Sequence, residues 1–150
     1  MTTEFPILIV EDNDDDLFIL KRALSTAGVA ETIRNVSDGE AALDYFSGKA
    51  TYRDRSEFPL PRLVLLDLKL PKVHGHDVLS WIRKQPALTG VVVIVLSSSK
   101  EPADIEKAYA YGANAYLVKP SAITELVDAI KAIQAFWLRY NIFNTLPRQG

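Results

Sequence analysis

Residues 63–71 read LVLLDLKLP, a run of large apolar side chains that is interrupted by one carboxylate, Asp67. Four apolar residues precede Asp67, and a short apolar run of this kind is typical of a strand that is covered on both faces. A buried and unpaired carboxylate is costly, so Asp67 must either be exposed at the end of the strand or be matched by cations. The surrounding sequence indicates which arrangement to expect.

Similar apolar segments alternate with helix-like segments along the chain. Short strands are predicted at 5–11, 32–36, 62–67, 91–97 and 114–119. Between them, apolar residues recur at helical spacing, as Leu17, Leu20 and Leu24 do. Alternating strands and helices predict an α/β fold, in which right-handed crossovers build a doubly wound sheet of five parallel strands.

The composition is that of one ordinary domain. The 150 residues are 48% hydrophobic and 24% charged, with a formal net charge of -2, which does not indicate binding to nucleic acid or to an anionic membrane. Cysteine is absent, which excludes disulfides, thiolate metal sites and a thiol nucleophile. The first residues, MTTEFPILIVED, match neither a signal peptide nor a membrane span. We therefore expect a cytoplasmic protein without nucleic-acid or membrane partners.

Polar and charged residues follow four of the predicted strands. Ligands of such open sheets bind at the carboxyl ends of the strands. Glu11 and Asp12 follow the first strand, Asp67 the third, Ser97 the fourth and Lys119 the fifth. We expect these side chains to converge on one edge of the sheet, with Asp67 exposed at a mouth where the other charges meet it.

The residue types at this edge suit phosphoryl chemistry. Three clustered carboxylates repel one another unless a cation joins them. Ligand sets made only of oxygen favour Mg²⁺, which retains waters and a phosphate oxygen. An aspartate can attack phosphorus as a nucleophile, while Mg²⁺ and a lysine neutralise the developing charge. A hydroxyl at Ser97 can hydrogen-bond a phosphoryl oxygen.

From about residue 5 to residue 138, the chain resembles the receiver domain of response regulators. The resemblance is carried by Glu11-Asp12, Asp67 in LLDLKLP, Gly75, Ser97 in VLS, Tyr116 and Lys119-Pro120. It implies a flavodoxin-like fold with strand order 2-1-3-4-5. It also implies a phosphoacceptor protein rather than an enzyme, with only self-phosphorylation from small donors and slow self-dephosphorylation.

The resemblance assigns a role to each matching residue. Asp67 accepts a phosphoryl group from the phosphohistidine of a sensor histidine kinase or phosphotransfer protein. Mg²⁺ is bound by the acidic side chains and a backbone carbonyl, namely Glu11, Asp12, Asp67 and the carbonyl of Lys69. Lys119 and Ser97 contact the phosphoryl oxygens, and Tyr116 changes rotamer together with Ser97 as the switch. The Lys119–Pro120 bond is cis in the family.

Two departures and one closer likeness refine this picture. The first acidic position is Glu11, where aspartate is commoner. Lys69 and Ser99 stand two residues beyond Asp67 and Ser97, beside the path of an attacking water, which leaves the phosphoryl lifetime open. The segment 48–61, LDLKLPKVHGHDVL and the tail FWLRYNIFNTLP resemble the stand-alone response regulators of bacterial phytochrome kinases.

Other interpretations stay open. A phosphohydrolase of the haloacid dehalogenase type also uses an aspartate after an apolar strand, but it requires a second aspartate where Lys69 stands. Asp14, Asp15 and Asp16 suit the first turn of a helix, where the macrodipole favours carboxylates, and we assign them no role in the site. The two histidines of the loop, His74 and His76, are expected to be solvated.

About thirty residues follow Lys119-Pro120, so we expect a receiver domain over 1–140 and a tail over 141–150, with output through protein contacts. The last helix carries one apolar stripe that can cover the sheet, formed by Leu126, Ile130, Ile133, Trp137 and Tyr140. Phe136 and Leu138 fall off that stripe, and Ile142, Phe143 and Leu146 continue beyond the expected end of the helix. An ordinary receiver domain has no core left for these residues. We predict a homodimer through these residues, the alternative being a tail that folds back over its own chain.

Overall fold

A computed structural model describes residues 5–144 and contains one sheet of five parallel strands. The strands are β1 (Ile7–Val10), β2 (Ile33–Val36), β3 (Leu63–Leu66), β4 (Val92–Ser97) and β5 (Ala115–Val118). Their order is β2-β1-β3-β4-β5, which confirms the predicted topology. Val10 is in register with Leu66, and Leu66 with Val95, so that the strands end along a common edge.

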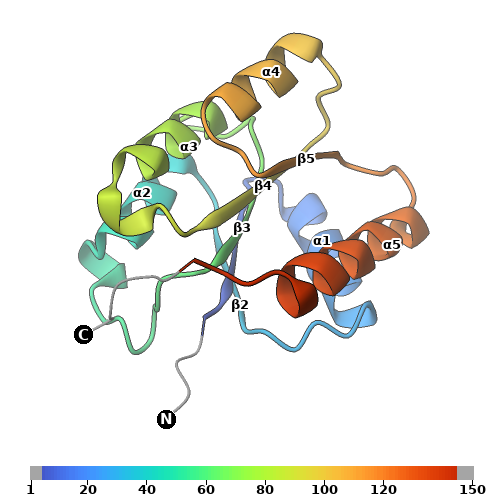
Figure 1. Cartoon of the computed structure of the whole chain (residues 1–150), viewed down its shortest axis with the longest axis horizontal. Helices are drawn as coiled ribbons and strands as arrows, with labels where there is room; N and C mark the ends of the chain where they lie inside the picture. The colour runs from blue at the N-terminus through green and yellow to red at the C-terminus, as the bar shows by residue number, and fades with distance from the viewer. Residues whose placement is uncertain (1–4, 145–150) are drawn as a thin grey trace.

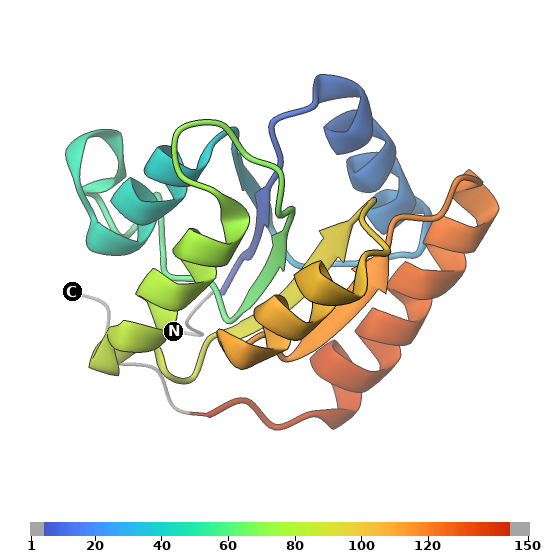
Figure 2. The ribbon, with the colours of Figure 1, turned by 90° about the horizontal axis from the view of Figure 1, so that it is seen from above.

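Helices cover both faces of the sheet (Figures 1 and 2). They are α1 (Asp14–Thr26), α2 (Gly39–Ser47), α3 (Gly75–Lys84), α4 (Pro102–Ala110) and α5 (Ile123–Ile133), with short 3₁₀ turns η1 (Ala50–Tyr52) and η2 (Pro86–Leu88). The segment η3 (Gln134–Tyr140) extends α5 as a π-helix. α1 and α5 lie on one face, and α2, α3 and α4 lie on the other.

The central strands are apolar on both sides because each side faces a separate core. Leu8 and Leu66 point into the cluster that packs against α2 and α3. Ile7 and Leu65 point into the cluster that packs against α1 and α5. This two-sided burial explains the continuous apolar runs of the sequence, and it fixes the backbone at the strand ends.

Local capping starts two helices beside the strand ends. The side chain of Asn13 accepts a hydrogen bond from the Asp16 N–H at 2.9 Å and so begins α1. The side chain of Asp38 accepts from the Ala41 N–H at 2.7 Å and begins α2. Satisfying these free N–H groups lets each helix begin within a few residues of its strand.

The segment 48–61 packs on the outside of α2. The Arg55 guanidinium donates to the carbonyls of Tyr45 at 2.7 Å and Phe46 at 2.8 Å, near the C-terminal end of α2. It also donates to the Phe58 carbonyl at 3.1 Å, within the segment itself. Arg55 therefore satisfies the last carbonyls of α2 and ties the long connection to it.

The apolar stripe predicted for the last helix holds for most of its length. Its first three members are buried, namely Leu126, Ile130 and Ile133. Trp137 packs against the same cluster, but Tyr140 is 72% exposed, so its assignment to the stripe is wrong. The prediction assumed α-helical spacing to the end of the chain, whereas residues 134–140 form a π-helix.

A π-helix bonds residue i to residue i+5, which moves the inward face by about one residue per turn. Leu138 stands five residues after Ile133 within the π-helix, whereas Phe143 lies beyond the end of that helix at Tyr140; both pack against the cluster under α1 and α5. The expectation that the domain's own core has no place for Leu138 and Phe143 is therefore wrong.

The end of the described chain returns to the start of the sheet. The Arg62 guanidinium lies between two aromatic rings, 3.6 Å from the centroid of Phe5 and 5.6 Å from that of Phe143. Phe136 and Ile142 remain 53% and 92% exposed, as predicted. Leu146 lies outside the described residues.

Candidate functional site

The predicted site residues are held at the ends of β1, β3, β4 and β5 by backbone bonds that extend the sheet. The Asp67 N–H donates to the Val10 carbonyl at 3.1 Å, and the Lys119 N–H donates to the Ser97 carbonyl at 2.8 Å. These bonds leave little freedom at the start of each side chain. The structure thus brings Glu11, Asp67 and Lys119 together as the sequence predicts.

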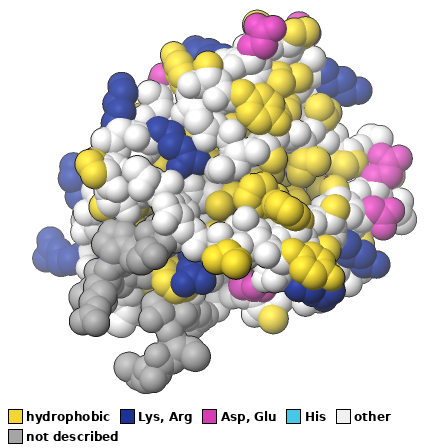
Figure 3. Space-filling model, in the orientation of Figure 1, with side chains coloured by type: hydrophobic (Ala, Val, Ile, Leu, Met, Phe, Trp, Pro, Cys, Tyr) yellow, Lys and Arg dark blue, Asp and Glu magenta, His cyan; other side chains and the backbone are white. Residues whose placement is uncertain are grey.

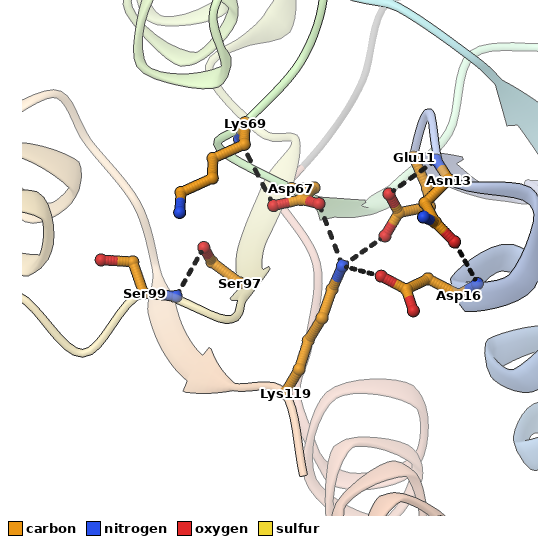
Figure 4. Close-up of polar contacts among 8 residues, drawn as sticks. All are labelled: Glu11, Asn13, Asp16, Asp67, Lys69, Ser97, Ser99 and Lys119. Carbon is orange, nitrogen blue, oxygen red and sulfur yellow. Dashed lines mark hydrogen bonds and ion pairs between the residues drawn. The ribbon is translucent and has the colours of Figure 1, made fainter. Parts of the chain in front are cut away.

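Lys119 is the centre of the cluster (Figure 4). Its ammonium lies 2.6 Å from a carboxylate oxygen of Glu11, 2.9 Å from Asp16 and 3.0 Å from Asp67. Among the residues that the structure describes, these are its ion pairs. One cation therefore joins carboxylates from β1, α1 and β3.

Burial separates the members of this cluster. Glu11 is 4% exposed and Asp67 is 8% exposed, so the expectation that Asp67 is exposed at an open mouth is wrong. Asp67 is matched by the ammonium of Lys119 instead, and the loop after β3 packs closely on the backbone of the strand end. A Cβ at Gly75 would stand 2.4 Å from the Asp67 carbonyl oxygen, so only glycine allows this close approach.

Burial also affects the pKa values of Glu11 and Lys119. Burial raises the pKa of Glu11 above its usual value, and the nearby charge of Asp67 raises it further, although the hydrogen bond from Lys119 opposes both. Burial disfavours the charged ammonium of Lys119, but its bonds to Glu11, Asp16 and Asp67 outweigh this and raise its pKa. Lys119 is therefore firmly protonated.

A second, partly overlapping group of carboxylates suits a divalent cation. Glu11, Asp12 and Asp67 each offer an oxygen, and these atoms lie within 4.8 Å of one another. Asp12 is exposed whereas the other two are buried, so the group opens to solvent on one side. An oxygen-only set with an open side fits Mg²⁺, which binds few carboxylates and keeps several waters.

The opposite side of Asp67 is lined by β4 and the loop after β3. Ser97 is fully buried, and its hydroxyl accepts a hydrogen bond from the Ser99 N–H at 3.2 Å. The Lys69 N–H donates to Asp67 over a long 3.4 Å, and its side chain extends toward Ser97 and Ser99 (Figure 4). The role of the Lys69 carbonyl stays a prediction.

The β4–α4 loop links this side to Tyr116. The Tyr116 hydroxyl donates to the Ser99 carbonyl at 2.9 Å, and the Ser99 hydroxyl donates to the carboxylate of Asp104, in α4, at 2.5 Å. These bonds join β5, the loop and the first turn of α4. A shift of the loop would therefore move Tyr116 and the start of α4 together.

The Lys119–Pro120 peptide bond is trans, as are the other peptide bonds of the described chain, so the expected cis bond is a wrong prediction. The two isomers of an X–Pro bond differ by only about 0.5–1 kcal/mol in favour of trans, so the presence of proline alone does not fix the isomer.

Sequence reasoning missed two contacts. Asp16 lies in the first turn of α1, as its assignment to a helix start requires, but it also reaches Lys119. His76 is 2% exposed rather than solvated, and its Nε2 lies 3.1 Å from the Asp104 carbonyl oxygen. The signal that could have placed Asp16 near the site is its position in the first turn of the helix that directly follows Glu11 and Asp12.

Comparisons with known proteins agree with this geometry. A family model described as response regulator receiver domain matches residues 7–131. The sequence is 39% identical over 137 residues to the probable methanogenesis regulatory protein FilR2 of Methanothrix harundinacea, covering 91% of this chain and 86% of that protein.

Two further relatives have solved structures. The response regulator Rcp1 of Synechocystis sp. is 33% identical over 132 residues, which are 88% of either chain. A crystal structure of its Mn²⁺-bound form matches with a TM-score of 0.81 over 96% of this chain and 99% of that one. The phosphorylated cyanobacterial phytochrome response regulator RcpA is 33% identical and matches with a TM-score of 0.86 over 95% and 100% of the two chains.

No helix of the described residues is long and apolar enough to cross a membrane. The family match spans the sheet and every predicted strand-end residue of the site. The chain therefore belongs to the response-regulator receiver-domain family and is related to phytochrome response regulators.

Proposed function

We propose that the chain is a phosphoacceptor that signals through phosphorylation of Asp67. The observation that carries the proposal is the ammonium of Lys119, which lies 3.0 Å from the Asp67 carboxylate at the sheet edge. A fixed cation beside a carboxylate can neutralise charge on a group transferred to that carboxylate. The phosphorylated state named for RcpA supports the same reading.

In the proposed reaction, an oxygen of Asp67 attacks the phosphorus of a phosphohistidine. The O–P bond forms while the P–N bond breaks, and the electron pair of the broken bond stays on the imidazole. Lys119 and Ser97 contact the oxygens of the transferred group. The Tyr116 hydroxyl bonds to the loop after Ser97, so movement of Ser97 changes the positions of Tyr116 and α4.

Mg²⁺ is the proposed cofactor. Glu11, Asp12 and Asp67 would hold it, with the carbonyl of Lys69 as the further ligand that the family resemblance implies. When bound, it supplies positive charge that offsets the repulsion between the carboxylates and the phosphoryl oxygens. The Mn²⁺ named for the Rcp1 crystal structure supports a divalent cation at such a site.

The proposed donor is a sensor histidine kinase of the phytochrome type or a phosphotransfer protein. RcpA is named as a phytochrome response regulator, and this likeness supports the pairing. Output through protein contacts, a receiver over 1–140 with a tail over 141–150, a homodimer and a cytoplasmic location belong to the same proposal.

The test uses acetyl phosphate as donor in the presence of Mg²⁺. We expect the full chain to gain one acid-labile phosphoryl group by intact mass, and Asp67→Asn to gain none. Asp15→Asn is the matched control, because it removes the same charge at an exposed position of α1. Labelling of Asp67→Asn at the level of the control would contradict the proposal.

The same reaction separates the proposal from a phosphohydrolase. A phosphoacceptor accumulates about one equivalent of bound phosphoryl group and releases phosphate slowly. A phosphohydrolase would release many equivalents from small phosphorylated metabolites. Phosphotransfer from a panel of purified histidine kinases, measured at short times, would then identify the donor.

A further inference from the structure

Asp16 is a carboxylate of the cluster to which none of the proposed roles applies. Its oxygen lies 2.9 Å from the Lys119 ammonium, closer than Asp67 at 3.0 Å. We propose that Asp16 is a positioning residue that holds Lys119 and competes with the phosphoryl group for it. The inference rests on the proposed phosphoacceptor function and adds a control on the availability of Lys119.

The backbone of Asp16 is fixed for this contact. α1 begins two residues after Asp12, and the Asn13 side chain accepts the Asp16 N–H at 2.9 Å. This cap sets the first turn of the helix and points the Asp16 side chain at the end of β5, where Lys119 stands (Figure 4). The contact is therefore a product of the helix start and not of a flexible loop.

The ammonium of Lys119 has no donor to spare in this arrangement. A lysine ammonium carries three N–H donors. Glu11, Asp16 and Asp67 accept one bond each, at 2.6, 2.9 and 3.0 Å. A phosphoryl oxygen on Asp67 can bind Lys119 only if one of these bonds is given up.

Asp16 differs from the other two partners. Glu11 and Asp67 belong to the carboxylate group that suits a divalent cation, whereas Asp16 is outside it among the described residues. Its side chain is 44% exposed, compared with 4% for Glu11 and 9% for Asp67. Asp16 is therefore the partner whose hold on Lys119 does not depend on the metal ligands, and the one that solvent weakens most easily.

The space around this contact is open to a ligand. A cavity of about 590 Å³ lies between α1 and the β5–α5 connection, and Glu11, Asp16 and Lys119 line it together with Ile19 and Ile123. A group that enters from this side meets Asp16 and Lys119 at the same time. Asp67 does not line this cavity, so the cavity shows that Asp16 and Lys119 are accessible together and says nothing of the approach to Asp67.

The experiment compares Asp16→Asn with Asp14→Asn in the full chain. Both remove one charge from the first turn of α1, but only Asp16 contacts Lys119. The first measurement is the affinity for beryllofluoride, a mimic of a phosphoryl group on a carboxylate, at saturating Mg²⁺. We expect Asp16→Asn to bind about fivefold more tightly than Asp14→Asn, because loss of one half-exposed, charge-assisted bond frees a donor.

The second measurement needs neither metal nor phosphoryl mimic. We expect the ¹⁵N resonance of the Lys119 ammonium to shift in Asp16→Asn and to stay unchanged in Asp14→Asn, with Asp16→Glu restoring part of the shift. Equal affinities in the two asparagine variants would overturn the competition, and an unchanged resonance would overturn the contact. A wild-type chain that binds no beryllofluoride would overturn the phosphoacceptor function and the competition with it, while the resonance still reports on the contact.

Discussion

At the scale of single residues, the site depends on a lysine that is surrounded by carboxylates. A buried ion pair adds little net stability, because taking both charges out of water offsets their attraction. Removing one partner is costly, because the other charge is left buried and unpaired. Glu11 and Asp67 are in that position with respect to Lys119.

Lys119→Ala should therefore destabilise the fold at neutral pH. We expect a loss of about 3–5 kcal/mol in the free energy of unfolding, measured by urea denaturation. Lys72→Ala is the control: its ammonium is exposed and lies 3.8 Å from Asp38 and 3.7 Å from Glu40, so its loss should cost about 0–1 kcal/mol.

The deficit of Lys119→Ala should shrink as the pH falls. Burial raises the pKa of Glu11 above 4.5, and loss of Lys119 removes a group that opposes this rise. A group whose pKa is raised in the folded state stabilises the fold at pH values below its pKa in the unfolded state. This stabilisation is lost as the pH rises through its pKa in the folded state. A deficit that is equal at pH 5 and pH 8 would argue against Glu11 as the uncompensated charge.

Asp12 and Asp14 offer a matched pair for metal binding. Asp12 belongs to the carboxylate group around Asp67, whereas Asp14 does not. We expect Asp12→Ala to weaken Mg²⁺ binding by about tenfold or more, since it removes a proposed ligand, and Asp14→Ala to change it little. Calorimetric titration of both variants measures the difference, and equal effects would mean that the wrong carboxylates have been assigned.

At the scale of elements, the connection between α2 and β3 is held by a few side chains on α2 and on the segment 48–61. Arg55 bonds the carbonyls of Tyr45 and Phe46 from outside the helix. The Tyr45 hydroxyl in turn donates to the Pro59 carbonyl at 2.8 Å. The loop is therefore a packed part of the domain.

Arg55→Lys should loosen this connection, because an ammonium cannot reproduce the planar fork that reaches several carbonyls at once. We expect a loss of about 1–3 kcal/mol in the free energy of unfolding and faster proteolysis within 48–61. Arg53→Lys, at an exposed position of the same segment, is the control and should behave as the wild type. Equal proteolysis of the two variants would contradict the role of Arg55.

Tyr45 provides a pH test of the same element. Burial raises its pKa from 10.0 to about 12, so the phenol stays neutral in the folded chain after it ionises in the unfolded one. The free energy of unfolding should therefore fall by about 2 kcal/mol between pH 10 and pH 12, since the folded state binds more protons than the unfolded state in this range. In Tyr45→Phe, which lacks the ionisable hydroxyl, urea denaturation should show a smaller fall over that range; an equal fall would assign the effect elsewhere.

At the scale of the whole molecule, exposed apolar side chains provide a candidate surface for the proposed homodimer. Hydrophobic side chains gather on the face that carries α4 and α5 (Figure 3). Phe136, Tyr140 and Ile142 are 53%, 72% and 92% exposed on η3 and just beyond it. Leu138 packs inward whereas these three are exposed, so they form the candidate surface for the proposed dimer.

We expect the full chain to sediment as a dimer at micromolar concentration and Ile142→Glu to sediment as a monomer. A charge at the centre of an apolar interface is costly, whereas it is tolerated at a site that is already in water. Phe18→Glu, at a 65% exposed position of α1, is the control and should keep the dimer. A wild-type chain that is monomeric under these conditions would exclude the homodimer.

The sequence by itself determined the topology and most of the site. Strands that are apolar on both faces have to lie between two layers of helices, and parallel strands present their carboxyl ends at one edge. Glu11, Asp67, Ser97 and Lys119 could therefore be placed together from their positions after the strands alone.

Only the tertiary structure decided how these groups pair and which of them are buried. Lys119 is 103 residues from Asp16 and 52 from Asp67 along the chain, so these pairs depend on contacts between segments far apart. The π-helix after Ile133 likewise shifts the inward face in a way that α-helical periodicity cannot predict. Residue patterns report what is near along one element, whereas pairing and burial depend on how separate elements meet.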